Sequence, residues 1–248
     1  MLRRITPRAL KLGFKLTQRA WSDTKSGQSQ KFASSSPAQS YPHSVSITQP
    51  ILNATTEQSK NNKVHNIKLA ARLIEDIEIK PQEVFSFWRS VGHPSKKNGY
   101  KKGINIIEGN IVEDYGGGLC QLSSIIYHTA LVVRLSVVER SNHSVDLYQY
   151  QERYTPLGSD SAVFYGYKDL RLRNDFKHPL SFRFEVLDET ITCHVTSPEA
   201  MEEHSVDFLL DQEDEQHVTV ITKYGQQSIA TSSYKKESVP HLLFEDAG

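Results

Sequence analysis

Residues 114–124 read Asp-Tyr-Gly-Gly-Gly-Leu-Cys-Gln-Leu-Ser-Ser and carry the strongest local signal in the chain. Three consecutive glycines are unfavourable inside a helix or a strand, because glycine loses more backbone entropy on ordering than any other residue. Directly downstream, apolar and small residues recur at helical spacing, at Leu122, Ile125, Ile126, Thr129, Ala130 and Val133. The pattern predicts a glycine turn followed by a helix that begins at or near Cys120.

A second helix is predicted upstream of this motif. Apolar residues recur every three or four positions, at Val64, Ile67, Ala70 or Ala71, Ile74 and Ile77, and Pro81 ends the pattern. Apolar runs with strand character lie over 83–88, 103–107, 111–112, 136–140, 145–150, 162–167, 180–187 and 191–196. The sequence therefore predicts one α+β domain with a central, mostly antiparallel sheet packed on two main helices, the second starting at the Gly-Gly-Gly-Leu-Cys motif.

The composition bounds the class of protein and its division along the chain. Of 248 residues, 38% are hydrophobic, 29 are basic and 29 are acidic, which excludes a collagen-like, coiled-coil or wholly disordered chain. Residues 22–49 are rich in Ser, Gln, Thr and Pro and resemble a linker, because they bury too little apolar surface to offset their ordering entropy. We expect a basic leader and flexible linker over 1–49, a folded domain over 50–198 and an acidic C-terminal extension over 199–248.

Charge is distributed unevenly. Residues 1–31 carry eight basic residues and one acid, whereas the chain from Glu185 onward carries 14 acids and three lysines. The body of the chain is not basic, which argues against nucleic acid as a partner. No apolar run reaches the length of a membrane helix and no export signal is recognised, so a cytoplasmic location is the default expectation. Leu10, Phe14 and Trp21 lie among basic residues, which predicts a weak contact of residues 1–21 with a membrane surface.

Cys120 is the candidate catalytic nucleophile. Glycine lets the backbone approach a substrate closely, and the positive end of a helix favours both a thiolate and an oxyanion. His143, at the start of a predicted strand, is the candidate base. Three acids are equal candidates for the carboxylate that orients this histidine: Asp146, Asp160 and Asp169. Backbone amides from Gly118 to Gln121 are the candidate oxyanion donors.

The glycine turn and nearby side chains are the candidates for substrate binding. The set comprises Gly116, Gly117, Gly118, Gln121, Trp88 and Tyr115. The two aromatic residues would either line a groove for a sugar or peptide or pack in the core, which is the commoner role of aromatic residues at strand spacing.

Two other interpretations of Cys120 stay open on sequence alone. A small thiol also packs a helix against a sheet, since cysteine is among the most often buried residues, and Cys193 fits that role in a predicted strand. Metal binding would require Cys120 to meet His128, His143 and His178 in space, and none of these shows compact metal-ligand spacing. We therefore predict no metal and no cofactor.

In their order along the chain, these motifs resemble the VanW family. The matching segments are 64–70, 81–88, Val91-Gly92, Gly99-Tyr100 with Gly103, 116–124, Glu139-Arg140 with His143, and Asp169-Leu170 with Asn174. The family is named after an accessory protein of B-type vancomycin resistance in bacteria, so the resemblance implies a role around peptidoglycan precursors or the cell envelope. The order of cysteine, histidine and acid also resembles that of papain-like and transglutaminase-like thiol enzymes, in arrangement alone.

Three hypotheses about function follow. In the first, the chain is a thiol-dependent hydrolase or transferase acting on an amide or peptide, which requires Cys120 and His143 to lie near hydrogen-bond distance. In the second, it is a non-catalytic module that binds a peptidoglycan fragment, which a buried Cys120 without polar neighbours would favour. In the third, it is a structural partner of another resistance or envelope protein, which a flat apolar surface would favour.

Overall fold

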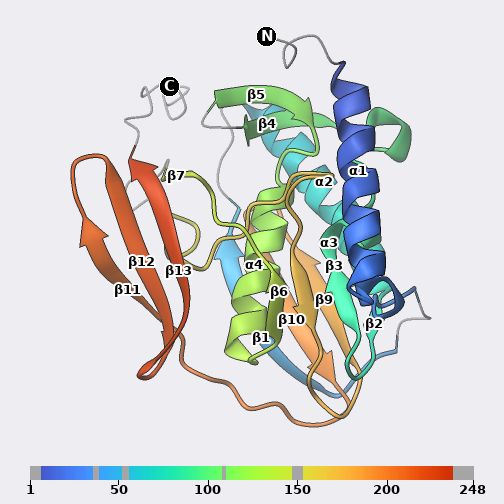
Figure 1. Cartoon of the computed structure of the whole chain (residues 1–248), viewed down its shortest axis with the longest axis vertical. Coiled ribbons are helices and arrows are strands. Elements are labelled where there is room, and N and C mark those ends of the chain that lie inside the picture. The colour runs from blue at the N-terminus through green and yellow to red at the C-terminus, as the bar shows by residue number, and fades with distance from the viewer. Residues whose placement is uncertain (1–6, 36–38, 52–55, 108–109, 147–152, 237–248) are drawn as a thin grey trace.

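The computed structural model describes residues 7–35, 39–51, 56–107, 110–146 and 153–236 (Figure 1). The helices are α1 (Arg8–Lys25), α2 (Glu57–Glu75), α3 (Phe87–Val91) and α4 (Leu119–Val132), with 3-10 turns η2 (Gln28–Gln30) and η3 (Lys96–Asn98). The strands are β1 (His43–Pro50), β2 (Glu78–Ile79), β3 (Val84–Ser86), β4 (Lys102–Ile107), β5 (Asn110–Tyr115), β6 (Ser136–Glu139), β7 (Val145–Asp146), β8 (Arg171–Arg173), β9 (Leu180–Val186), β10 (Thr190–Ser197), β11 (Asp207–Glu213), β12 (His217–Tyr224) and β13 (Gln227–Lys236).

The central sheet has the strand order β1-β10-β9-β2, and every neighbouring pair in it is antiparallel. β1 pairs with β10 along its whole length, so that Val45 lies opposite Val195 and Ile47 lies opposite Cys193. From Thr190 to Val195, alternate residues of β10 are buried, because successive side chains of a strand point to opposite faces of the sheet. Cys193 is one of these buried residues, which confirms that it packs in a strand.

Two helices pack on this sheet, as predicted. α2 contacts β9, α4 contacts β1 and β10, and the two helices touch each other (Figure 1). The apolar stripe of α2 is buried, and Ile67, Ala70 and Ile74 are fully inaccessible. The side chain of Thr56 caps the start of α2 by accepting a hydrogen bond from the Ser59 amide at 3.1 Å. The α+β architecture is thereby confirmed.

Two smaller sheets flank the helices. β3, β8 and β6 form one antiparallel sheet. β4 pairs antiparallel with β5, and residues 108–109 between them lie outside the described residues. The predicted strand over 83–88 is shorter than expected. Ser86 accepts a hydrogen bond from the Arg89 amide at 3.3 Å and starts helix α3.

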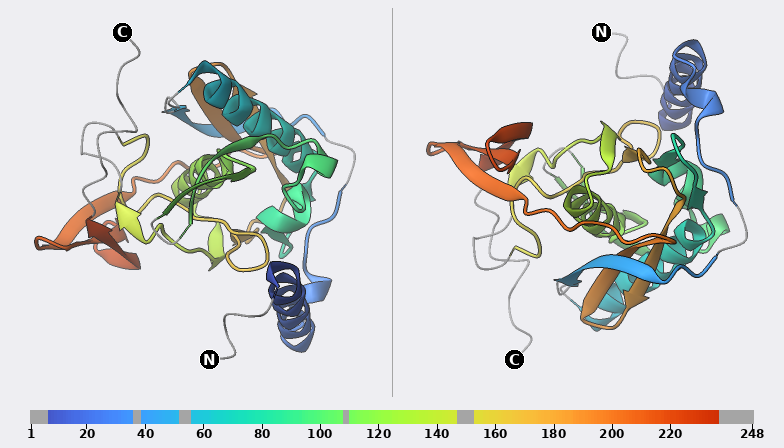
Figure 2. Two further views of the ribbon diagram at one scale, coloured as in Figure 1. Left: turned by 90° about the horizontal axis from the view of Figure 1, so that it is seen from above. Right: turned by 90° about the horizontal axis from the view of Figure 1, so that it is seen from below.

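The C-terminal strands form a separate sheet of order β11-β12-β13-β7, in which β7 runs parallel to β13. Its small apolar cluster contains Val218, Val220 and Tyr234, with Leu157 and Phe208 packed against them. Figure 2 shows this sheet and α1 on different flanks of the molecule. β11 and β12 contain the apolar runs near 206–210 and 218–224, whereas β13 has no clear apolar alternation.

Three segments differ from the sequence-based expectation. Part of the expected leader and linker is regular structure, because α1 docks on the domain and β1 pairs with β10. The strand predicted over 162–167 does not form: the chain reverses at Gly166, whose φ is 81°, and Phe164 bridges to Lys168. Among the described residues, no helix is long and apolar enough to cross a membrane.

Candidate active site

The glycine motif forms a tight turn against helix α2. Gly116 and Gly118 have φ values of 90° and 97°, in the left-handed region that glycine alone adopts without strain. A Cβ atom on Gly118 would lie 2.8 Å from Cγ of Lys63 and 3.1 Å from Cγ1 of Ile67, and one on Gly116 would lie 2.8 Å from Cβ of Pro94. Glycine is therefore needed at both positions for conformation and for space.

A buried asparagine of α2 holds this turn in place. The Asn66 amide nitrogen donates to the Gly117 carbonyl at 3.1 Å and to the Lys101 carbonyl at 3.0 Å. The Asn66 side-chain oxygen accepts from the Lys101 amide at 2.8 Å. These bonds satisfy a side chain that is completely buried, and they fix the position from which helix α4 begins.

Cys120 is the second residue of α4, as its distance from the glycines predicts. The first four amides of a helix have no acceptor within it. The Leu119 amide bonds to the Gly116 carbonyl at 3.3 Å and the Gln121 amide bonds to the Gly118 carbonyl at 3.0 Å. Within the described part of the chain, no acceptor is found for the Cys120 amide. Of the four predicted oxyanion donors, the amides of Leu119 and Gln121 are therefore engaged, and those of Gly118 and Cys120 have no acceptor among the described residues.

The loop before β8 packs on the same end of α4. Its Ser161 carbonyl accepts a hydrogen bond from Ser123 Oγ at 2.6 Å, and the Ser161 amide donates to Ser124 Oγ at 2.9 Å. The loop then passes over the thiol, where Cys120 Sγ donates to the Val163 carbonyl at 3.6 Å. Two serines of α4 therefore place this loop beside the partly buried thiol.

His143 connects the thiol to a carboxylate. Its Nδ1 lies 2.6 Å from Oδ2 of Asp160, and its backbone amide donates to the same oxygen at 2.7 Å. The imidazole also interacts with the side chain of Cys120, and this interaction lowers the pKa of the thiol. Because Nδ1 contacts Asp160, Nε2 is the ring nitrogen that remains to interact with Cys120. The side chains thus form a Cys-His-Asp series.

Asp160 is buried and held by several donors. Arg140 Nη2 donates to its Oδ1 at 2.9 Å, and the Tyr234 hydroxyl donates to the same atom at 2.5 Å. Arg140 also bonds to Ser232 Oγ at 2.6 Å and stacks over the Tyr127 ring, 4.8 Å from its centroid. These contacts fix the carboxylate that in turn orients the imidazole.

The charges of this series stabilise one another. Burial alone would raise the pKa of Asp160, but the hydrogen bond and charge of His143, with Arg140 and Tyr234, lower this pKa to about 2. Burial would likewise lower the pKa of His143, but Asp160 and Cys120 raise it to about 10. His143 overcomes the effect of burial on Cys120 and lowers the pKa of its thiol. Each of these shifts favours the charged form of its group, and the charged imidazole favours ionisation of the neighbouring thiol.

The other two candidate acids have different partners. Asp146 pairs with Arg153. Asp169 is buried and contacts strands β3 and β8, since it accepts hydrogen bonds from Ser86 Oγ at 2.6 Å and Arg171 Nε at 3.0 Å. Of the three acids, Asp160 is the one whose carboxylate contacts His143.

The side chains predicted to bind substrate also have structural contacts. Gln121 Nε2 donates to the Pro50 carbonyl at 2.6 Å and so ties α4 to the end of β1. Trp88 Nε1 donates to the Lys168 carbonyl at 2.7 Å, and its ring packs against the main core, as does Tyr115. The core interpretation therefore accounts for the contacts of both aromatic residues.

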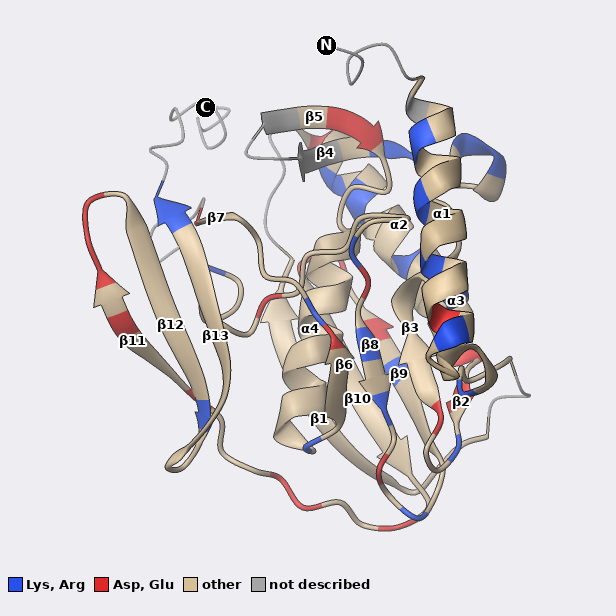
Figure 3. Ribbon diagram, viewed as in Figure 1, with Lys and Arg blue, Asp and Glu red and all other residues tan. Residues whose placement is uncertain are grey.

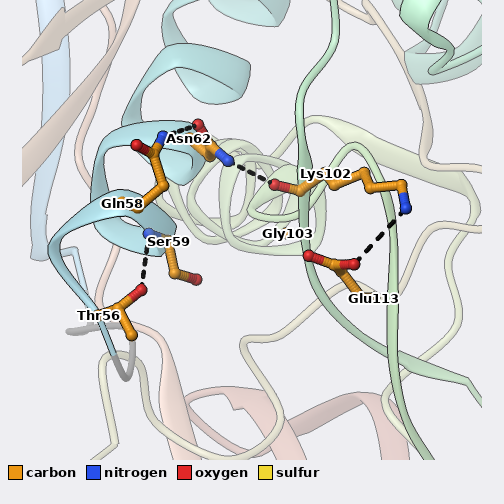
Figure 4. A pocket seen from close by; sticks show the side chains of 7 residues that line it. All are labelled: Thr56, Gln58, Ser59, Asn62, Lys102, Gly103 and Glu113. Carbon is orange, nitrogen blue, oxygen red and sulfur yellow. Dashed lines mark hydrogen bonds and ion pairs between the residues drawn. The ribbon is translucent and has the colours of Figure 1, made fainter.

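A small polar pocket lies away from the thiol, between the start of α2 and the β4–β5 hairpin (Figure 4). Its lining residues are Thr56, Gln58, Ser59, Asn62, Lys102, Gly103 and Glu113. Several of them bond to one another, as Asn62 does to the Lys102 carbonyl at 2.9 Å and Lys102 to Glu113 at 3.6 Å. Cys120 and His143 do not line it.

Of the histidines considered as metal ligands, His143 interacts with Cys120, whereas His128 and His178 have other partners. His128 packs edge-on against Phe208 and lies 3.4 Å from Gln49 Nε2, and burial lowers its pKa to about 4. His178 Nδ1 lies 2.9 Å from Ser197 Oγ. Across the described ranges, no three His, Cys, Asp or Glu side chains are placed to hold a metal ion.

Sequence reasoning missed two parts of the site. Tyr234 comes from a strand with no distinctive motif, 74 positions beyond the Asp160 that it contacts. The contact between the Val163 carbonyl and Cys120 was not predicted, because a strand was expected over 162–167. Arg140, in contrast, lies in the Glu139-Arg140 segment that the family resemblance had already singled out.

Comparison with known proteins agrees with the motif order. Residues 62–196, more than half of the chain, match the family model described as VanW like protein. The chain is 38% identical over 116 residues to the vancomycin B-type resistance protein VanW of Enterococcus faecalis (strain ATCC 700802 / V583), a segment covering 47% of this chain and 42% of that protein. It is 34% identical over 125 residues to the uncharacterized protein YoaR of Bacillus subtilis (strain 168), covering 50% and 40% respectively.

The matched segments span about two fifths of the length of these curated relatives. No solved structure matches the chain significantly. Cys120, His143 and Asp160 all lie inside the segment that the family model matches, whereas Tyr234 lies beyond it. By this match and by the ordered motifs around the Gly-Gly-Gly-Leu-Cys turn, the chain belongs to the VanW family.

Proposed function

We propose that the chain is a thiol-dependent hydrolase or transferase that acts on an amide or peptide bond. The observation that carries the proposal is the series in which Asp160 holds Nδ1 of His143 at 2.6 Å while the imidazole serves Cys120. A thiol needs this environment to react as a thiolate near neutral pH, because a neighbouring imidazolium lowers its pKa. In this scheme, Cys120 and His143 are catalytic residues and Asp160 is a positioning residue.

The first half-reaction uses the ion pair directly. The Cys120 thiolate attacks the substrate carbonyl carbon, and the Cys120 amide donates a hydrogen bond to the oxygen as negative charge develops there. The imidazolium of His143 gives its Nε2 proton to the leaving amine as the carbon–nitrogen bond breaks. A thioester on Cys120, a free amine and a neutral His143 result.

The second half-reaction regenerates the pair. Neutral His143 removes a proton from water, or from an acceptor amine, which attacks the thioester carbon. The carbon–sulfur bond breaks, Cys120 leaves as a thiolate and His143 is again an imidazolium. Water yields a carboxylic acid and an amine yields a new amide, so the same residues support hydrolysis or transfer.

The name of one relative suggests a substrate class. VanW of Enterococcus faecalis is named as a vancomycin B-type resistance protein. We therefore propose an accessory role in glycopeptide resistance or cell-envelope metabolism, with a peptidoglycan precursor or fragment as the substrate. A binding module without turnover is less well supported, because Cys120 has the polar neighbours His143 and Val163.

The chemistry is tested first by the rate at which iodoacetamide alkylates Cys120 as a function of pH. Wild type is compared with His143→Ala, and Cys120→Ala measures the contribution of Cys193, whose pKa burial raises to about 12. We expect fast alkylation that persists well below pH 8 and that His143→Ala slows at neutral pH. An ordinary thiol titration, unchanged in a folded His143→Ala variant, would contradict the catalytic pair.

Turnover is tested separately by mass spectrometry. The full chain is incubated with soluble peptidoglycan fragments and quenched in acid, which preserves thioesters. We expect an acyl adduct on Cys120 in the wild type, and no adduct with Cys120→Ala. A reactive thiolate that forms no adduct and releases no amine from any fragment would refute this choice of substrate.

A further inference from the structure

Helix α1 has two distinct faces, of which one is anchored on the domain. Side chains at Leu12 and Leu16 pack over Gly166, where an added Cβ would lie 2.6 Å from Cδ1 of Leu12. Farther along the same face, Arg19 pairs with Glu139 at 2.6 Å.

The last contact of this inner face is an ion pair. Asp23 accepts two hydrogen bonds from Arg171, at 2.6 Å and 2.9 Å. A planar guanidinium that meets both carboxylate oxygens fixes geometry as well as charge. These contacts recur with the helical period, so they hold the helix in one rotational setting.

The outer face is apolar and cationic. Leu10, Phe14 and Trp21 are 65%, 69% and 65% exposed, and their spacings of four and seven residues place them in one line along the helix. Lys25 lies at the end of this line, with its Nζ 5.1 Å from the centroid of the Trp21 ring.

The charge of α1 is also divided between its faces. Lys11 and Lys15 follow Leu10 and Phe14 directly in the sequence. Figure 3 shows basic positions along much of α1. Its single acid, Asp23, is on the inner face and is paired with Arg171, so the line of apolar side chains has cations beside it and no acid of α1.

We infer that the outer face of α1 docks on an anionic lipid surface, with the helix lying in the plane of the interface. A helix that binds at a bilayer surface combines large apolar side chains, which enter the headgroup boundary, with lysines that attract acidic headgroups. The inference is independent of the thiol chemistry proposed above.

A lipid surface fits this face better than a protein partner does. The apolar line is one side chain wide, and the neighbouring positions on the exposed side include Gly13, Thr17 and Thr24. A stable protein interface usually buries about 800 Å² per partner around a packed apolar centre. A narrow row of large side chains beside cations provides no such centre, whereas it can insert between lipid headgroups.

The experiment is flotation of the full chain with vesicles of phosphatidylcholine, alone or mixed equally with phosphatidylglycerol. We expect binding to the mixed vesicles that weakens with added salt, and much weaker binding to phosphatidylcholine alone. Replacing the apolar line (Leu10→Ser, Phe14→Ser and Trp21→Ser together) should lower the partition coefficient at least about tenfold. Lys11→Glu with Lys25→Glu should lower it by about tenfold or more.

The matched control changes another exposed apolar pair. Leu209 and Leu210 on β11 are 48% and 58% exposed and lie on an acidic strand, so Leu209→Ser with Leu210→Ser should leave vesicle binding unchanged. All these side chains are exposed, and circular dichroism of each variant establishes that it is folded. Equal binding to both vesicle types, no binding, or binding that the α1 variants do not reduce would overturn the inference. Self-association abolished by Phe14→Ser, without vesicle binding, would assign the face to a second copy instead.

Discussion

The hydroxyl of Tyr234 donates a hydrogen bond to Oδ1 of Asp160 at 2.5 Å, while Oδ2 of the same carboxylate holds His143. Tyr234 also accepts a hydrogen bond from the Gly158 amide at 2.8 Å, so one buried side chain fixes both the acid and the loop that carries it. This tyrosine belongs to β13, beyond the segment that the family model matches. The C-terminal sheet is therefore part of the structure around the thiol.

Tyr234→Phe should destabilise the fold, by about 1–3 kcal/mol at pH 7, because a buried carboxylate loses a donor and a buried amide loses its acceptor. The effect should depend on pH. The folded pKa of Asp160, about 2, lies below its unfolded value of about 3.9, so its ionisation stabilises the fold above about pH 4. This stability is lost as the pH falls toward 2. Because the variant has a less depressed pKa, its difference from wild type in urea unfolding should shrink between pH 7 and pH 3.

The control for this variant is a second tyrosine of the same sheet. Tyr224 donates to the Leu131 carbonyl at 2.6 Å, and that acceptor does not titrate. Tyr224→Phe should therefore destabilise the fold to a similar extent at both pH values. Equal pH dependence in the two variants would show that Tyr234 does not act through Asp160.

Asp160→Asn should shift the pH profile of Cys120 alkylation upward by at least about one pH unit. Loss of the carboxylate lowers the pKa of His143, and a neutral imidazole stabilises the thiolate less. Asp146→Asn is the matched control, because Asp146 pairs with Arg153. It should leave the alkylation profile unchanged. An upward shift in Asp146→Asn and none in a folded Asp160→Asn would reverse the assignment of the orienting acid.

Gly118→Ala should lower the free energy of unfolding by more than about 2 kcal/mol. The substitution places a side chain at a left-handed φ of 97° and drives its Cβ into Ile67 and Lys63. Gly13→Ala offers the opposite case, since Gly13 is helical and nothing lies within 4 Å of an added Cβ. That variant should be neutral or up to about 1 kcal/mol more stable in chemical denaturation. Similar losses in both variants would show that the turn geometry is not the cause.

Asp23→Asn should loosen α1 without unfolding the domain. Arg171 would lose a bidentate partner, while Asp169 still accepts its Nε hydrogen bond at 3.0 Å. We expect faster hydrogen exchange in α1 and unchanged protection in α4. Asp175→Asn, which weakens the exposed pair with Arg173, should leave α1 exchange unaltered. Unchanged exchange of α1 in Asp23→Asn would show that the ion pair is not its anchor.

Local features of the fold were readable from the residues alone. The period of Val64, Ile67 and Ile74 predicts α2, because a helix repeats every 3.6 residues whatever its surroundings. The glycines before Cys120 predict a turn and a helix start, because the backbone freedom of glycine is a property of those few residues themselves. Cys120 and His143 could be identified as candidate nucleophile and base, because a thiol and an imidazole are residue types suited to those roles.

The choice among distant partners came only from the folded chain. The sequence does not distinguish among Asp146, Asp160 and Asp169, because each follows His143 within a few tens of residues. The residue type does not show which of these carboxylates lies next to the imidazole in space. Asp160 reaches the imidazole because Ser123 and Ser124 fasten its loop to α4.

The same reason explains the contacts made by the two ends of the described chain. Tyr234 lies at Asp160 because β13 pairs beside β7, and α1 lies on the domain because Asp23 meets an arginine 148 positions away. Periodicity and turn chemistry act over a few residues, whereas these contacts depend on the packing of whole elements. The sequence by itself therefore determined the two main helices, the glycine turn before Cys120 and the family, because these depend on neighbouring residues. The tertiary packing determined which acid contacts His143, which tyrosine contacts that acid and which face of α1 is anchored on the domain.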